Sequence, residues 1–262
     1  MTAIFGRRNN LFAQLALTLL ALVFVAPLVM TARVSLQGEG LGNYSAVLTQ
    51  PLLPQFFLNS AIVTSGTILL TYAITVLAAY AFSKLDFGGK GLLFNAVLAG
   101  LTLPGVAVIL PMFIVVRRLN LFDNYLAVIL PLTAFGLPFA LLQMRNFLDG
   151  LPNELLDAAR IDGCNSFTCL TKIVLPLIKP ITVVVILLTF LGAWNEYFLG
   201  LVFMQDESRQ LITQLPQYFI EERFQDTGKV FAALVLISLP VMLAYLSLQR
   251  YFEDGLVSGS LK

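Results

Sequence analysis

The stretch LFAQLALTLLALVFVAPLVMTA, residues 11–32, holds 22 residues and no charged side chain. The hydrocarbon core of a bilayer is about 30 Å thick, and a helix needs about 20 apolar residues to cross it. Because backbone groups in lipid must pair within their own segment, we expect this run to be a transmembrane helix. It follows Arg7 and Arg8, but its apolar part is longer than that of a usual signal peptide, so we expect no cleavage.

Five further apolar runs have a length that suits a membrane span. They are Phe56–Ser83, Gly91–Val116, Asn124–Met144, Pro180–Gln205 and Val230–Gln249. Among the six runs only Pro180–Gln205 carries a charge, Glu196. The sequence lacks the alternating segments of about ten residues that are typical of a transmembrane β-barrel. It therefore predicts an all-α integral membrane protein with six transmembrane helices, in a single domain over residues 1–262.

The distribution of basic residues predicts the orientation of these spans. Six spans place both termini on one side, and ten of the 16 Lys and Arg residues fall in the segments on that side. Basic residues are enriched in cytoplasmic segments, so we expect both termini to be cytoplasmic. The pair Arg117–Arg118 falls on the other side and argues weakly against this orientation.

Prolines concentrate in the third and fourth runs. They are Pro104, Pro111, Pro131 and Pro138. A proline inside a helix removes a backbone hydrogen bond and kinks the helix. The cluster fits a bundle that bends around a pathway, and it equally fits irregular packing, because proline is common in membrane helices.

A charged segment, from Asp149 to Lys179, interrupts the apolar pattern with four acidic and three basic residues. The run from Pro152 to Asp162 favours a helix, with Pro in its first turn, acids near its start and strong helix formers in its middle. Gly163 is placed to end this helix as a left-handed cap. Asn165 or Ser166 can then cap a second helix that returns to the membrane.

One face of the first loop helix carries small and polar residues. Leu155, Ala158, Ala159 and Asp162 follow the i, i+3, i+4, i+7 spacing, which puts them on one side. We expect this side to be exposed and to dock a partner protein. The alternative is a helix lying on the membrane surface, for which more basic and more large apolar residues would be typical.

The same segment resembles the EAA loop of permease subunits of ATP-binding-cassette (ABC) importers. That pattern reads E-A-A, three residues, G, nine residues and I-x-L-P. The chain has Asp157-Ala158-Ala159, three residues, Gly163, nine residues and then Ile173-x-Leu175-Pro176. It departs from the pattern only in Asp157, which is one methylene shorter than the Glu of the family and shortens the reach of any salt bridge to the partner.

Four more segments narrow the resemblance to the carbohydrate-type, maltose-G-like permeases. They are GAWNEYFLGLVF at 192–203, LPNELLDAARIDG at 151–163, ILPMFIVVRRLNLFDNYLAVILP at 109–131 and QRYFEDGLVSGSLK at 249–262. The resemblance implies an importer in a bacterial or archaeal inner membrane. It also implies a second, different permease subunit, two separate ATPase subunits that use ATP and Mg, and an external solute-binding protein.

This family couples ATP binding to transport through the EAA loop, which moves with the ATPases and rocks the pore between inward-open and outward-open states. The implied ATPase-docking residues are Glu154, Leu155, Asp157, Ala158, Ala159, Asp162, Gly163, Ile173, Leu175 and Pro176. The implied substrate is a sugar or a sugar-like solute.

No chemistry-bearing motif is found in the chain. The sequence contains no GxxxxGK[ST] phosphate loop, and GGKG at 88–91 lacks its spacing. It contains no histidine, which excludes Ser-His-Asp and Cys-His arrangements. Cys164 and Cys169 match no zinc spacing and are interpreted as half-buried thiols. We therefore expect a subunit that is not an enzyme and holds no cofactor or metal.

Two further groups are candidates for solute contact. Trp194, Asn195, Glu196 and Tyr197 would combine an aromatic surface with hydrogen-bonding groups inside the fifth run. An intramembrane charge usually faces water or the bundle interior, so we expect Glu196 either to line the pore or its outer gate or to make a structural hydrogen bond between helices. The segment Asp206–Lys229, which contains Gln214, Gln217 and Tyr218, resembles the external loop that in some family members reaches into the binding protein. A solvated connector is the alternative.

Two other functions stay open from the residues alone. An ion-coupled secondary transporter would show several intramembrane acids or inverted repeats. A membrane scaffold would need no docking helix of this spacing.

Overall fold

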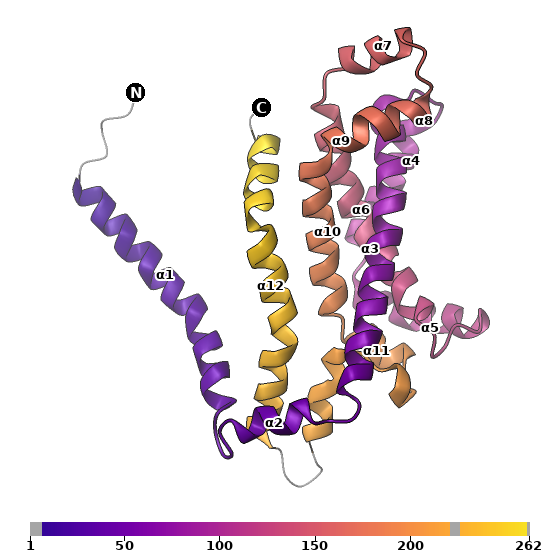
Figure 1. Ribbon diagram of the computed structural model, residues 1–262. Helices are drawn as coiled ribbons and strands as arrows, with labels where there is room; N and C mark the ends of the chain where they lie inside the picture. The colour runs from indigo at the N-terminus through magenta and orange to yellow at the C-terminus, as the bar shows by residue number, and fades with distance from the viewer. Residues whose placement is uncertain (1–6, 221–225, 261–262) are drawn as a thin grey trace. The chain divides into compact units, whose positions relative to one another are not determined.

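The structure is a computed structural model that describes the backbone of residues 7–220 and 226–260, and the side chains of residues 12–220 and 226–247. Its elements are helices (Figure 1). The α-helices are α1 (Arg7–Val34), α2 (Gly42–Leu48), α3 (Leu53–Lys84), α4 (Lys90–Ala99), α5 (Ile109–Arg118), α6 (Leu126–Asp149), α7 (Glu154–Ile161), α8 (Ser166–Cys169), α9 (Leu175–Leu177), α10 (Lys179–Trp194), α11 (Phe198–Phe203) and α12 (Thr227–Ser260). Short 3₁₀ or π turns are η1 (Gly100–Thr102), η2 (Gly105–Val108), η3 (Leu170–Val174), η4 (Glu207–Arg209) and η5 (Ile212–Phe219).

Within the described residues, four unbroken helices have the length and apolar composition of a membrane span: Phe12–Val34, Leu53–Lys84, Leu126–Asp149 and Thr227–Ser247. Two bent pairs raise the number to six if each pair is one span. The prediction of an all-α integral membrane fold is confirmed, with one bend inside the third run and a second bend at Ile178, just before the fifth run.

The break in the third run follows from Pro104. Proline disfavours helical backbone at the residue before it. Leu103 accordingly has an extended conformation, with φ −79° and ψ 117°, and the segments Lys90–Thr102 and Gly105–Arg118 meet at 97°. Of the other prolines predicted to produce kinks, Pro131 and Pro138 lie inside α6, which continues through both.

The chain divides into two compact units, which are described separately. Unit 1 comprises residues 1–53 and 215–239. In this unit Asn43 of α2 is fully buried, and its Nδ2 donates to Ser35 O at 2.9 Å and to Gln37 O at 2.7 Å. Gly228 lies so close to Asn43 that a Cβ on Gly228 would come within 2.4 Å of Asn43 Nδ2. Glycine is therefore required where the start of α12 meets α2.

Unit 2 comprises residues 54–214 and 240–262 and holds two buried apolar clusters. One cluster joins the C-terminal turns of α3 and α6 to α7, α8 and the start of α10. The other surrounds Phe203 of α11 and contacts α5 and the start of α6. We call these two regions the α7 end and the α11 end. Figure 1 shows α7 lying across its end of the unit, beyond α8 and α9.

Hydroxyl groups line the inner face of α3 between the two clusters. Thr64, Thr67, Thr71 and Thr75 are all buried and follow helical spacing. Thr67 Oγ1 donates to Val63 O at 2.8 Å. The other three hydroxyls have no hydrogen-bond partner among the described residues. Such groups are costly in an apolar interior, so this face of α3 is not optimised for packing alone.

Candidate functional site: the α7 loop and the α11 end

The corner between α7 and α8 is closed by two backbone hydrogen bonds. Gly163 N donates to Arg160 O at 3.0 Å, and Cys164 N donates to Ala159 O at 2.9 Å. This is the Schellman pattern, which needs a left-handed residue after the helix. Gly163 supplies it with φ +85°, so the prediction of a left-handed glycine cap is confirmed.

The second loop helix begins at Asn165, the first of the two residues predicted as its cap. The Asn165 Oδ1 accepts from Thr168 N at 2.8 Å, which satisfies one free N–H of α8. The chain then runs through η3 and α9, where Ile173 and Leu175 are half-buried and Pro176 is exposed. The loop therefore returns to α10 as a series of short helical turns.

The exposed face of α7 differs in part from the prediction. Leu155, Ala158 and Asp162 are exposed as expected, but Ala159 is only 7% exposed and packs in the cluster of the α7 end. The prediction that Ala159 shares the exposed face is wrong, because Leu156 and Ala159 form the side that faces the core. Ile161, by contrast, is 87% exposed.

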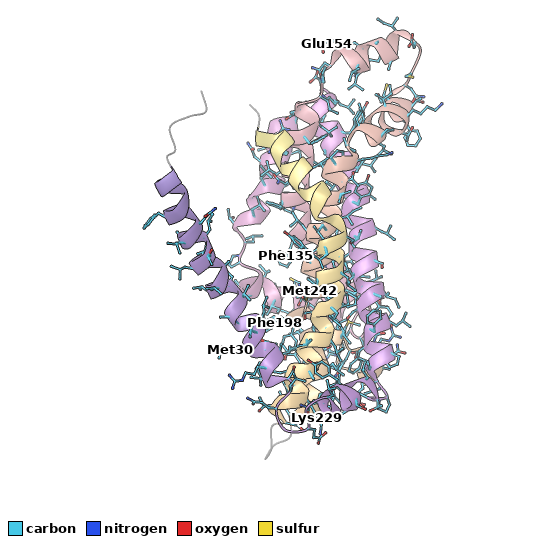
Figure 2. All side chains as sticks on the ribbon, turned by 60° about the vertical axis from the view of Figure 1, so that its left-hand side comes forward. Met30, Phe135, Glu154, Phe198, Lys229 and Met242 are labelled. Atoms are coloured by element: carbon cyan, nitrogen blue, oxygen red, sulfur yellow. The ribbon has the colours of Figure 1, made fainter. Side chains whose placement is uncertain are left out.

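Charged residues on α7 make few contacts within the chain. Asp157 pairs with Arg160 at 3.3 Å, and both side chains are more than half exposed. Such a pair contributes little to folding stability and leaves both groups accessible. Glu154 starts the helix at the tip of the unit, far from Phe198 (Figure 2).

The last turn of α3 holds the entry to α7. Lys84 Nζ donates to Leu151 O at 2.9 Å and to Asn153 Oδ1 at 2.8 Å. Ser83 Oγ donates to Asp149 Oδ1 at 2.6 Å. These contacts could not be predicted from the sequence, because the partners are more than 60 residues apart along the chain.

At the other end of unit 2, the residues predicted to meet solute do not form one surface. Trp194 is buried against Phe190, with ring centroids 5.8 Å apart, and against Phe57 at 5.3 Å. Asn195 and Tyr197 are exposed. The indole is thus part of the apolar packing, while the polar neighbours face outward.

Glu196 lies in the bend between α10 and α11. Its Oε1 accepts from Leu199 N at 2.6 Å, and its backbone O accepts from Thr213 Oγ1 at 2.6 Å. The carboxylate therefore acts at the start of α11, where the free N–H groups and the helix dipole favour a negative charge. This bond joins Glu196 to a residue only three positions further along the chain, so it tests neither the pore lining nor the hydrogen bond between helices that the sequence predicts.

The segment that follows α11 is bonded to α3 through Asn59, which is fully buried. Asn59 Nδ2 donates to Ser208 O at 2.9 Å and to Gln210 O at 2.8 Å, while Oδ1 accepts from Tyr125 Oη at 2.8 Å. Nearby, hydrogen bonds from the Ser208 hydroxyl and amide lower the pKa of the Asp206 carboxyl. This part of the segment is therefore firmly anchored.

The three residues predicted for contact with a binding protein differ in exposure. Gln214 is 1% exposed, and its Oε1 accepts from Leu211 N at 2.8 Å. Gln217 is exposed and Tyr218 is half-buried. Gln214 therefore supports the fold of the segment, whereas Gln217 offers an accessible side chain.

A cavity of about 280 Å³ lies among α3, α6 and α10. Thr67, Gln143 and Thr189 contribute polar groups to its wall, and Phe135 and Phe139 contribute aromatic rings. Figure 2 places Phe135 between Glu154 and Phe198 along the unit. These residues were not predicted from the sequence, although hydroxyl and amide groups within apolar runs can indicate a polar pathway through the membrane.

Comparison with known proteins relates the chain to membrane transporters. The family described as binding-protein-dependent transport system inner membrane component matches residues 72–258. The diacetylchitobiose uptake system permease protein NgcG of Streptomyces coelicolor is 30% identical over 222 residues, which cover 84% of this chain and 74% of the relative. The trehalose/maltose transport system permease protein MalG of Thermococcus litoralis is 33% identical over 225 residues, covering 85% and 81%.

A solved structure shares the fold. It is a bacterial ABC transporter involved in the import of the acidic polysaccharide alginate, and one of its chains matches with a TM-score of 0.81 and 24% identity. The match covers 96% of this chain and all of the other.

Proposed function

The chain belongs to the family of binding-protein-dependent transport system inner membrane components, and we propose from this premise that it carries a sugar or sugar-like solute. Members of the family are the multi-pass inner-membrane permease subunits of ABC importers, which are not enzymes, need no cofactor of their own, and work with a separate ATPase and a solute-binding protein. The relatives named above take up diacetylchitobiose and trehalose or maltose, which supports a carbohydrate as substrate.

We propose that the α7 loop is the part of the chain that docks on the ATPase. The observation that carries this proposal is the Gly163 corner, which holds α7 at the tip of unit 2. Leu155, Ala158 and Ile161 are then presented to a partner. The part of the loop that returns to α10, formed by η3 and α9, contains Ile173, Leu175 and Pro176.

The remaining assignments follow from the same proposal. Residues 1–262 act as one permease domain with both termini cytoplasmic, which puts α7 in the cytoplasm beside the ATPase. A second, different permease subunit completes the pathway, and two ATPase subunits bind ATP and Mg. Gln217 is the best exposed of the residues proposed to meet the solute-binding protein.

For the solute path, we propose that the exposed side chains of Asn195 and Tyr197 contact the hydroxyl groups of the solute at the α11 end. Glu196 and Trp194 shape this end through the hydrogen bond to Leu199 and the aromatic contacts. Replacing Asn195 with Ala is then expected to weaken uptake more than replacing Trp194 with Phe, which keeps an aromatic ring.

The test of the function is transport by the purified assembly. The complex is isolated from its native membrane through a tag on this chain and reconstituted in vesicles with its ATPase and binding protein. We expect uptake of radiolabelled trehalose or diacetylchitobiose that requires ATP. Solute movement by this chain without any ATPase, driven by an ion gradient, would instead identify a secondary transporter, and a complex without ATPase would identify a scaffold.

A further inference from the structure

Three hydrogen bonds attach the end of α3 to the last residue of α6 and to the segment that connects α6 to α7. Ser83 bonds to Asp149, the last residue of α6, and Lys84 bonds to both Leu151 and Asn153 in the connection to α7. An ammonium group has three donors, so it can serve a backbone carbonyl and an amide oxygen together. Lys84 therefore joins two residues of the α6–α7 connection to α3, which lies more than 60 residues earlier in the chain.

Buried packing supports the same attachment from the other side of α7. Ala79 and Tyr80 of α3 belong to the buried cluster that contains Leu156 and Ala159 of α7. The inner face of α7 and the last turns of α3 thus belong to one buried cluster. Rotation of α7 away from α3 would break the lysine bonds and expose apolar side chains together.

These contacts matter because α7 has covalent connections only to α6 and, through α8, η3 and α9, to α10. We propose that Lys84 is a positioning residue that makes α3 and α7 move as one body. A displacement of α7 would then reach α3 directly, and α3 carries Thr67 in the wall of the cavity. This inference rests on the proposed docking of α7 on an ATPase.

The first experiment separates coupling from folding. Lys84→Met removes the ammonium group and keeps the apolar stem, Lys84→Arg keeps a charged donor, and Lys90→Met is the matched control. Lys90 Nζ donates to Leu85 O at 2.7 Å and pairs with Asp86 at 3.7 Å, and among the described residues it makes no bond to the α7 connection. The readout is the stimulation of ATP hydrolysis in the reconstituted complex by the co-purified, naturally loaded binding protein.

Changes within coupling networks alter the coupling by roughly two- to thirtyfold. We expect Lys84→Met to lower the stimulation by a factor in this range at equal amounts of assembled complex, Lys84→Arg to restore most of it, and Lys90→Met to leave it unchanged. If Lys84→Met reduces only the yield of complex and the remaining complex is stimulated like the wild type, Lys84 is merely structural and the inference is wrong.

A covalent link provides an independent test. Lys84→Cys and Asn153→Cys are combined in a chain with Cys164→Ser and Cys169→Ala, and a cleavable bismaleimide of about one lysine length joins the two thiols. Bodies that move together tolerate such a link, so stimulation should persist in the linked complex. Loss of stimulation that returns on cleavage would show that α7 moves against α3. A wild-type complex that lacks an ATPase, or ignores its binding protein, would refute the proposed function itself.

Discussion

Substitution of Gly163 tests whether the corner of the α7 loop depends on backbone conformation or on space. The φ of Gly163 is +85°, and a Cβ placed on it would meet nothing within 4 Å. Left-handed backbone costs an ordinary residue about 1–2 kcal/mol. Since about 1.4 kcal/mol is tenfold in an equilibrium, Gly163→Ala should reduce the population of the correct corner by roughly 5- to 30-fold.

The order of the effects of three substitutions at Gly163 distinguishes a requirement for left-handed backbone from a requirement for space. Asn tolerates left-handed backbone best among the other residues and a β-branched residue tolerates it worst, so the loss should increase from Gly163→Asn through Gly163→Ala to Gly163→Val. The assay is the amount of ATPase that co-purifies with each variant from membranes holding equal amounts of the chain, followed by ATP-dependent uptake. If Gly163→Ala behaves as the wild type and only larger residues fail, the cause is contact with the partner and the backbone argument is refuted.

Three further outcomes are expected. Asn59→Ala should lower the free energy of unfolding by about 2–4 kcal/mol, because it removes a fully buried amide that bonds to Ser208 O, Gln210 O and Tyr125 Oη, and an unchanged melting temperature in detergent would contradict this. Gly66→Ala should lower the free energy of unfolding by about 1–3 kcal/mol, since the new Cβ would lie 2.7 Å from Ile129 Cδ1. Adding Ile129→Val should recover part of this loss in the same assay, and no recovery would show that the contact is not the cause. The hydrogen bond from Lys229 lowers the pKa of Asp226 below its usual 3.8, so the stability that this carboxylate contributes is present above that pH and is lost as the pH falls through the lowered pKa. Melting curves of wild type and Asp226→Asn should therefore converge on acidification below about pH 4, and a constant difference would exclude the bond as the cause.

The sequence allowed the membrane class and the glycine corner to be predicted because both depend on local properties. Apolar runs of sufficient length lie within α1, α3, α6 and α12, since a helix pairs its backbone groups within one segment, as lipid requires. The corner at Gly163 needs only a left-handed position after a helix. In both cases the residues concerned determine their own conformation.

Other features depend on neighbours that the sequence does not reveal. Pro104 and Pro138 each have a glycine nearby in the sequence, but Pro138 lies in a helix that packs on α10. Ala159 suits either face of a helix, and only the cluster at the α7 end decides that it is buried. Lys84 bonds to partners 67 and 69 residues away, so its role could not be read from its own surroundings.

The 97° break at Pro104 bears on the charge balance that predicts the membrane orientation. The two arms, Lys90–Thr102 and Gly105–Arg118, rise only about 20 Å each at 1.5 Å per residue, so neither crosses the bilayer alone. The pair counts as one of six spans only if both arms are tilted and cross the bilayer together. Arg117 and Arg118 then end the second arm, with the Arg117 guanidinium 4.6 Å from the centre of the Phe122 ring. In that arrangement this pair of basic residues keeps its weight against cytoplasmic termini.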